Sequence, residues 1–313
     1  MKTECLRAAG IWVDSDRVSS LKEFGIILYS GEITGMLGLV GSGITVVADA
    51  LSGRKKLEKG QIYMDHTPVQ IRGMAQAEKM GIYVISEKTI FLDDLRLEEN
   101  LCLSQRQESM GITFPSEKQI SRIRRCMEEL KIQLKLKEYP KKLGSLECHL
   151  AEILRAYLMG CRILILNHIA NRYTRKELEK LKDVLDLLKE KGIAILLLES
   201  SCERVCKGTD SLYVLRGGRV EGIFERKEYD PGKIKRVMLG DYEIPDTQKT
   251  QFFYENDKTL LLEARDLEST AFKELCFQVE KGEVIGFWEE ENGICQPLLK
   301  VLWGEEKTVK GSL

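Results

Sequence analysis

The stretch that decides the fold is rich in glycine and runs Gly38-Leu39-Val40-Gly41-Ser42-Gly43-Ile44-Thr45. Residues 33–39, which lead into it, are mostly apolar and are typical of a buried β-strand. Residues 46–51, directly after it, favour a helix. A glycine-rich turn between a strand and a helix lets backbone N–H groups surround an anion. The stretch therefore predicts an anion-binding loop in an α/β protein.

The remaining patterns alternate between strands and helices in an order that fits this prediction. Strands are expected at residues 6–13 and 24–29, and short apolar runs at 163–166 and 193–198 are typical of parallel strands covered on both faces. Helices are expected at 116–130, beginning at the capping residue Ser116, and at 147–159, with a helical crossover near 178–188. This order indicates an α/β nucleotide-binding architecture.

The chain contains two copies of one sequence pattern at a constant separation of 251 positions. The separation holds at four anchor segments, which begin at 21 and 272, 31 and 282, 51 and 302, and 59 and 310. The first copy is expected to span residues 1–240, followed by a polar linker at 241–258 and a second, incomplete domain at 259–313. The second copy ends at Leu313, the counterpart of Ile62, so we expect it to expose Phe277, Val284, Phe287 and Leu299 and to cause poor solubility or dimerisation.

Composition excludes several other classes of protein. Hydrophobic residues make up 43% and charged residues 31% of the 313 positions, which is ordinary for a soluble globular protein. The 48 basic and 49 acidic residues nearly cancel, without an extended basic stripe, so no nucleic-acid partner is expected. The N-terminus lacks the pattern of a signal peptide. Nine irregularly spaced cysteines, including Cys202 and Cys206, give no zinc pattern and fit reduced thiols.

Short segments along the chain resemble the ATP-binding subunits of ABC importers, and the resemblance covers nearly the whole chain. Residues 92–100 and the tandem layout are similar to the ribose, galactose and other monosaccharide importers, whose ATPase subunit is two fused domains. The resemblance implies a P-loop NTPase fold of the ABC ATPase type, with an antiparallel β subdomain, a helical insertion at about 101–157 and a partial second copy. The matching segments are 31–33, the glycine loop, 51–53, 60–62, 81–82, 99–100, 143–152, 163–166 and 214–219.

The resemblance implies ATP and Mg²⁺ as cofactors, but the residue types that would hold them are largely replaced. The family's phosphate-binding lysine corresponds to Ile44, and a charge-assisted contact of this kind contributes about 1.5 to 3 kcal/mol. Thr45 keeps a hydroxyl where the family places a magnesium ligand, although it equally suits a residue at a helix start. The expected cofactor-binding residues are Gly38, Leu39, Val40, Gly41, Ser42, Gly43, Ile44, Thr45, Ser86 and Asn167.

The positions that carry the family's hydrolytic chemistry also depart from its pattern. Asn167 and His168 stand where the family has an aspartate that supports magnesium and a glutamate that activates water. His168 is the candidate base, against a simpler role as a polar residue that closes a strand. Ser86 occupies the place of a glutamine that faces the transporter, and Ser200 the place of the switch histidine. Both serines are too short to take over these tasks.

Two further motifs of the family are altered as well. The signature segment reads Leu143-Gly144-Ser145-Leu146-Glu147, and Leu146 is expected to place a side chain where the backbone should approach a phosphate. The adenine-stacking aromatic is expected near Ser15, with Trp12 as a distant alternative. In the second copy, residues 289–296 replace the glycine loop and begin with three glutamates, which would repel phosphates.

These losses together favour a pseudo-ATPase subunit that acts through protein contacts. Its expected partners are a membrane permease and a second ATP-binding subunit, as a homodimer or heterodimer, at the inner face of the cell membrane in the cytoplasm. The alternatives are a working sugar-importer ATPase with an atypical site, a regulatory or interaction module outside transport, and a decaying or truncated gene product without a biochemical role. An effect of Ile44→Lys on nucleotide affinity tests the first alternative, and neighbouring permease genes test the second.

Overall fold

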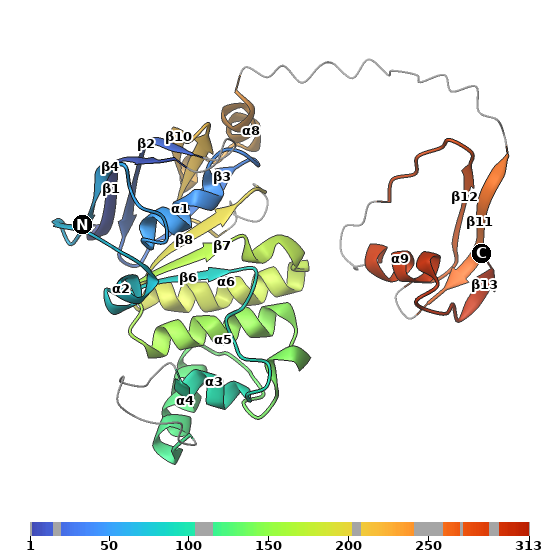
Figure 1. Ribbon diagram of the computed structural model, residues 1–313, viewed down its shortest axis with the longest axis horizontal. Coiled ribbons are helices and arrows are strands. Elements are labelled where there is room, and N and C mark those ends of the chain that lie inside the picture. The colour runs from blue at the N-terminus through green and yellow to red at the C-terminus, as the bar shows by residue number, and fades with distance from the viewer. Residues whose placement is uncertain are drawn as a thin grey trace. The chain divides into compact units, whose positions relative to one another are not determined.

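The computed structural model describes residues 2–14, 20–103, 115–201, 208–240, 259–269, 272–287 and 294–312, without the side chains of 171 and 172. The chain forms two compact units, Met1–Tyr242 and Glu243–Leu313 (Figure 1). The expected linker at 241–258, Ser15, Cys202, Cys206 and the three glutamates at 289–291 lie outside the described residues.

A six-stranded sheet forms the centre of the first unit, in the order β10-β9-β3-β8-β7-β6. Strands β9, β3, β8, β7 and β6 run parallel, and β10 pairs antiparallel with β9 at one edge. All six residues of β3 are buried, as expected for a parallel strand covered on both faces. The strands are β3 (Ile33–Gly38), β6 (Ile82–Ser86), β7 (Ile163–Asn167), β8 (Ala194–Glu199), β9 (Ser211–Arg216) and β10 (Arg219–Glu225).

Alternate residues of the parallel strands pack into different layers. Leu164 and Leu166 of β7 share a core with α5 (Ser145–Leu158) and α6 (Arg175–Glu190). Ile163 and Ile165 share the opposite core with α1 (Ile44–Leu51) and with the antiparallel strands. A smaller core lies between β9 and α8 (Pro231–Leu239), and α2 (Met74–Lys79) precedes β6. The two faces of the sheet therefore carry a helical layer and a mixed layer.

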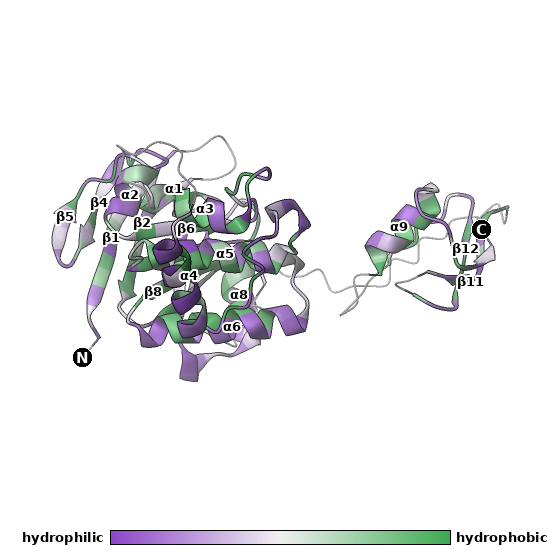
Figure 2. Ribbon diagram, turned by 90° about the horizontal axis from the view of Figure 1, so that it is seen from below, coloured by the Kyte–Doolittle hydropathy of each residue, from purple (hydrophilic) through white to green (hydrophobic). Residues whose placement is uncertain are grey.

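The antiparallel β subdomain of the first unit is a four-stranded sheet in the order β2-β1-β4-β5. Its strands are β1 (Glu4–Val13), β2 (Leu21–Tyr29), β4 (Lys59–Met64) and β5 (Thr67–Val69). The helical part includes α3 (Leu97–Leu103), α4 (Glu117–Glu129), the short 3₁₀ turn η1 (Pro140–Lys142) and α5. Helix α4 is largely hydrophilic (Figure 2), and it begins at a Ser116–Gln119 capping box, which confirms the predicted start. No described helix has the length and apolarity needed to cross a bilayer.

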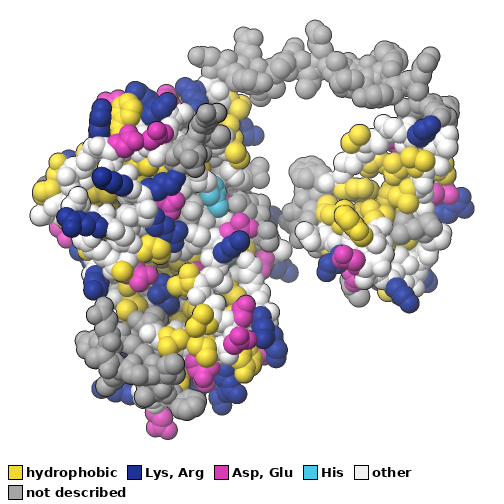
Figure 3. Space-filling model, viewed as in Figure 1, with side chains coloured by type: hydrophobic (Ala, Val, Ile, Leu, Met, Phe, Trp, Pro, Cys, Tyr) yellow, Lys and Arg dark blue, Asp and Glu magenta, His cyan; other side chains and the backbone are white. Residues whose placement is uncertain are grey.

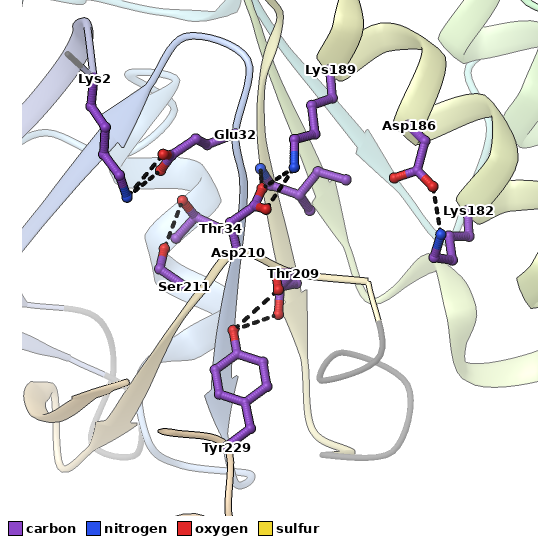
Figure 4. Close-up of polar contacts among 11 residues, drawn as sticks. Lys2, Glu32, Thr34, Lys182, Asp186, Lys189, Thr209, Asp210, Ser211 and Tyr229 are labelled. Atoms are coloured by element: carbon purple, nitrogen blue, oxygen red, sulfur yellow. Dashed lines mark hydrogen bonds and ion pairs between the residues drawn. The ribbon is translucent and has the colours of Figure 1, made fainter. Parts of the chain in front are cut away.

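An ion pair between Lys189 and Asp210 lies at the amino ends of β3 and β9 (Figure 4). Lys189 Nζ lies 2.6 and 2.7 Å from the two carboxylate oxygens of Asp210, and the Ile33 N–H donates to Asp210 Oδ2 over 2.8 Å. Asp210 therefore joins α6 to the beginning of β3 just before β9 starts. Tyr229 comes directly after the turn η3 (Arg226–Glu228). Its hydroxyl oxygen lies 2.9 Å from Thr209 Oγ1.

The described part of the second unit contains a small antiparallel sheet and one helix. Its strands β11 (Leu260–Glu268), β12 (Leu275–Glu280) and β13 (Lys310–Ser312) form a sheet in the order β12-β11-β13, beside α9 (Cys295–Trp303). Phe277, expected to be exposed, is instead partly buried against the unit's own core and lies edge-on to Phe287. Hydrophobic side chains gather on one face of the unit (Figure 3), and those exposed include Val284, Phe287, Leu299 and Trp303.

The exposed apolar face of the second unit predicts self-association. Val284 is 94% and Trp303 81% exposed, whereas their counterparts 251 positions earlier, Ile33 and Ser52, are each 1% exposed. Large exposed apolar patches favour association. We expect the chain to form dimers or larger species in sedimentation velocity, and the double variant Val284→Lys, Trp303→Lys to shift it toward monomer. Ile223→Lys, at an exposed apolar position of β10, is the matched control, and a monodisperse wild-type monomer at high concentration contradicts the prediction.

Candidate functional site

Four parallel strands end at one edge of the central sheet and bring most predicted site residues there. β3 ends at Gly38, where the glycine loop begins, and its neighbour β8 ends at Glu199. β7 and β6 follow in the sheet, and their last residues, Asn167 and Ser86, lie opposite each other in the register. Ligands of open α/β sheets bind beside the carboxyl ends of the strands. This edge is therefore the candidate site.

The backbone of the glycine loop keeps the geometry that its glycines predict. Gly41 and Gly43 have positive φ angles of 85° and 94°, which side-chain-bearing residues rarely adopt. A Cβ atom at Gly43 would lie 2.5 Å from the carbonyl oxygen of Ser20, so only glycine fits. The loop is tied to its surroundings by the Gly218 N–H, which donates to the Ser42 carbonyl over 2.8 Å.

The side chains of the loop, by contrast, do not suit a phosphate. Ile44 is 3% exposed and packs in the core beneath α1, so no cation stands at this position. The Ile44 N–H, at the start of α1, donates weakly to Ser42 Oγ over 3.4 Å. Val40 at the tip is 98% exposed, Leu39 is also exposed, and so is Thr45. The loop offers backbone amides and the hydroxyl of Thr45, but it has lost the charge that neutralises phosphates.

The end of β7 places two polar residues in a strained and partly unsatisfied setting. His168 has left-handed backbone angles, φ 55° and ψ 34°, and precedes the turn η2 (Ile169–Arg172). Its Nδ1 lies 3.9 Å from Glu199 Oε2. Within the described part of the chain, Asn167 Oδ1 and His168 Nε2 are buried and make no hydrogen bond. Burial lowers the pKa of His168, against an opposing effect of Glu87, so the ring favours the neutral form.

Glu199 is a residue of this site that the sequence interpretation passed over in favour of Ser200. Glu199 is buried at the end of β8, and its Oε1 accepts the Ala170 N–H over 3.1 Å. Ser200, the next residue, is exposed. A carboxyl at the end of a predicted buried strand was the available signal, because buried carboxyls are uncommon without a specific partner.

The backbone carbonyl of Ser86 contacts a histidine of α5. The Ser86 carbonyl oxygen lies 3.1 Å from Nε2 of His149, which also lies 3.3 Å from the Glu87 carbonyl oxygen. The other ring nitrogen of His149, Nδ1, contacts the hydroxyl of Tyr173. These contacts were not predicted. The available signal was a histidine among the mostly apolar residues that are buried on α5.

The signature segment begins α5, and one prediction about it is wrong. Glu147 accepts the Gly144 N–H over 2.9 Å, and Ser145 is exposed at the helix start. Leu146 does not stand in the way of a ligand, because its side chain is 6% exposed and packs inside the helical core. The displaced glycine and serine, and not steric blocking by Leu146, distinguish this segment.

The edge of the sheet as a whole does not fit a magnesium-bound triphosphate. Glu87 acts on His168 as a nearby negative charge, the carboxyl of the buried Glu199 lies 3.9 Å from His168 Nδ1, and the lysine position is apolar. Negative side chains repel phosphates, most strongly where water is excluded. Asn167 adds no charge for a metal. The described residues contain no group of three or more His, Cys, Asp or Glu side chains that could hold a metal ion.

The strand order, the glycine loop between β3 and α1 and the helical layer define a P-loop cassette of the α/β class. The family model described as ABC transporter matches residues 21–170, so this part of the chain is similar to an ABC transporter domain. Members of this family bind ATP, typically with Mg²⁺.

Curated relatives extend the similarity beyond the matched domain. The chain is 28% identical over 316 aligned residues to the ribose import ATP-binding protein RbsA of Clostridium perfringens strain 13, and 25% identical over 312 to the RbsA of Jannaschia sp.. The alignments cover 100% and 98% of this chain. They cover only 62% and 59% of the two relatives. The similarity therefore includes both units described above.

Solved structures share the fold. The ADP conformation of MJ1267, an ATP-binding cassette of an ABC transporter, matches with a TM-score of 0.65 at 21% identity, covering 76% of this chain and 96% of that one. A nucleotide-free ATP-binding cassette from an ABC transporter matches with a TM-score of 0.63 at 20% identity, over 76% of this chain and 100% of that one. These matches support the ABC ATPase fold of the first unit.

Proposed function

We propose that this chain is the ATP-binding-cassette subunit of a sugar-type ABC importer, and that its cassette no longer hydrolyses ATP and acts through protein contacts. The observation that carries the proposal is the buried, apolar Ile44 at the start of α1, at the position where the family's phosphate-binding lysine is expected. The names of the relatives point to ribose import. The backbone of the glycine loop keeps its geometry although the lysine position is apolar. This supports a cassette that keeps its fold but does not hydrolyse ATP.

The protein-binding face that we propose lies on the segment after β6 and on the helical part. Ile90 and Leu92 are apolar, yet 56% and 57% exposed. Buried polar side chains fix the backbone beneath them, since Glu152 accepts the Ile90 N–H and Asn100 accepts the Leu92 N–H. Apolar side chains held outward in this way suit a protein partner. The partner we propose is a membrane permease, with the cassette attached to the inner face of the membrane in the cytoplasm.

The second unit supports a tandem arrangement of two cassette domains. Helices α1 and α9 begin 251 positions apart, at Ile44 and Cys295. Left-handed backbone recurs at the same separation, with φ angles of 56° and 54° at Glu23 and Glu274 and of 92° and 90° at Gly60 and Gly311. We propose that residues 259–313 begin a second cassette domain, joined by the linker at 241–258. Pairing with another ATP-binding subunit belongs to the same proposal.

Magnesium-dependent ATP hydrolysis by the purified chain is the direct test. We expect release of phosphate to stay at the level of a heat-treated sample, because the lysine position is the buried, apolar Ile44 and the aspartate position is the uncharged Asn167. Steady-state phosphate release at saturating ATP and Mg²⁺ measures it. Robust hydrolysis that depends on magnesium contradicts the proposal.

One observation favours the alternative of a working ATPase with an atypical site. His168 Nδ1 lies 3.9 Å from Glu199 Oε2, and a carboxylate that orients a histidine is a common arrangement for a general base. In that case Thr45 would contact the metal. Substitution of His168 by Gln, which cannot accept a proton near neutral pH, would then abolish hydrolysis, whereas no activity is lost if the site is inert.

A further inference from the structure

Residues 87–96, called the 87–96 loop below, connect β6 to α3 and run beside α5 (Figure 1). Polar side chains buried beneath the loop anchor its backbone. The Ile90 N–H donates to Glu152 Oε1 over 2.7 Å, and the Leu92 N–H donates to Asn100 Oδ1 over 2.9 Å. Asn100 Nδ2 donates back to the Leu92 carbonyl over 3.0 Å. The amide of Asn100 has a fixed charge state, whereas the carboxyl of Glu152 can gain or lose a proton.

Glu152 is buried in the middle of α5, where an ionised carboxyl is costly. Burial raises the pKa of Glu152 to about 7, and the Ile90 N–H and Arg155 offset this effect only in part. Arg155 is partly neutralised by its own partner, because its Nη2 lies 3.2 Å from Glu78 Oε1 of α2. The titratable and charged groups around this position are Cys148 and Arg155 of α5, Glu78 of α2, Tyr83 of β6, Tyr173, and Glu87 and Asp93 of the loop.

We propose that Glu152 is a proton-controlled anchor of the 87–96 loop, which is closed on α5 while the carboxyl carries its proton and opens when the proton is lost. In the closed loop the neutral carboxyl still offers an oxygen to the Ile90 N–H. Opening lets water reach Glu152, and its pKa then falls back toward the ordinary value of 4.5. Because the closed state has the higher pKa, proton binding favours closure. The stabilisation of the closed loop by the proton on Glu152 is complete below pH 4.5 and is lost as the pH rises from 4.5 to about 7.

His149, one turn earlier on α5, is a second anchor with the opposite response to pH. Carbonyl oxygens only accept hydrogen bonds, so Nε2 of His149 carries the proton that faces Ser86 and Glu87. Tyr173 then donates its hydroxyl proton to Nδ1. Burial lowers the pKa of His149 in the closed loop. Protonation of this ring therefore favours the open loop, and this effect grows as the pH falls. A loop that opens as the pH rises therefore identifies Glu152, and not His149, as the group in control.

Hydrogen–deuterium exchange of the full chain at pH 6 and pH 8, corrected for the chemical exchange rate, tests the proposal. We expect the opening equilibrium of peptides covering residues 87–92 to rise roughly tenfold between these pH values in the wild type. Glu152→Gln keeps an acceptor without the charge and should show the same low opening at both. Asn100→Ala, the matched control, should loosen Leu92 and leave the pH response at Ile90 in place.

Two results would overturn the proposal: corrected exchange that is equal at pH 6 and pH 8 in the wild type, or a rise of the same size in Glu152→Gln. If the Gln variant does not fold, ¹³C-carboxyl NMR of the wild type decides instead. The titration of Glu152 must then share its midpoint with loop opening, and a midpoint near 4.5 contradicts the proposal. The loop can pass this test whether or not the chain hydrolyses ATP, so its outcome is separate from that of the proposed function.

Discussion

The triple variant Ile44→Lys, Asn167→Asp, His168→Glu is expected to bind ATP in the presence of Mg²⁺, whereas the parent chain is expected to show no saturable binding. The lysine would replace an apolar side chain at the start of α1, directly after the glycine loop, and would return a positive charge to that position. A charge-assisted contact contributes about 1.5 to 3 kcal/mol. The lysine alone should therefore raise affinity by roughly one to two orders of magnitude. Isothermal titration calorimetry of the full chain, with and without Mg²⁺, measures the effect.

The matched control carries Ile44→Met with the same changes at Asn167 and His168. Methionine keeps the apolar contacts of Ile44 without a charge, so this control should gain much less affinity than the lysine variant. A cation at a helix N-terminus opposes the helix dipole, so the lysine variant should be slightly less stable without ATP and stabilised by it. Tight, magnesium-dependent binding by the parent would contradict the proposed loss of ATP chemistry and favour an active importer ATPase.

Asp210→Ala is expected to cause the largest loss of stability among single changes outside the apolar cores. The carboxylate accepts from Lys189 Nζ and from the Ile33 N–H, and both donors lose their partner in the variant. Hydrogen bonds to charged groups contribute about 1.5 to 3 kcal/mol each, or about 3 to 6 kcal/mol for the two donors. Because the Lys189 and Asp210 side chains are 32% and 21% exposed, solvent screening reduces this sum, and we expect a decrease of about 2 to 4 kcal/mol in the free energy of unfolding. Urea denaturation followed by circular dichroism measures it.

Asp186→Ala provides the control for that measurement. Asp186 pairs with Lys182 on the surface of α6 at 2.5 Å, and both side chains are more than 40% exposed (Figure 4). Exposed ion pairs of this kind contribute about 0.3 to 0.5 kcal/mol. A loss of equal size in the two variants would show that Asp210 acts as an ordinary surface charge and does not fasten the sheet.

Much of the fold could be predicted from the sequence because its signals are local. The apolar run before Gly38, the glycines and the helix that follows depend on neighbouring residues, and the structure confirms β3 and α1. Ser116 marked the start of α4 through its capping box. The continuous apolar runs near 163 and 193 also became the buried strands β7 and β8.

The site was predicted less completely, because its decisive contacts join distant segments. The sequence placed Asn167 and His168 at the end of a predicted strand, and Ser86 was identified only through the family resemblance. The parallel register brings Ser86 and Asn167 to one edge. Nothing local indicated that Glu199 would lie beside His168, or that Glu152 would hold the Ile90 N–H 62 positions away. Leu146 was misjudged for a related reason. Which face of α5 packs on the core decides where the Leu146 side chain lies, and the short motif alone does not define that face.

The central position of β3 also has a consequence for synthesis of the chain. Ile33 pairs with Ile195 on one side, and Thr34 with Ser211 on the other, so β3 is made some 160 to 177 positions before its partners. At roughly 5 to 20 residues per second, this delay on the ribosome lasts on the order of ten to thirty seconds. During that time an apolar strand with no exposed face in the native fold has neither neighbour. The growing chain is then most in need of shelter by a chaperone, and the nearby strands β1, β2 and β4, which pair within 60 positions, can associate first.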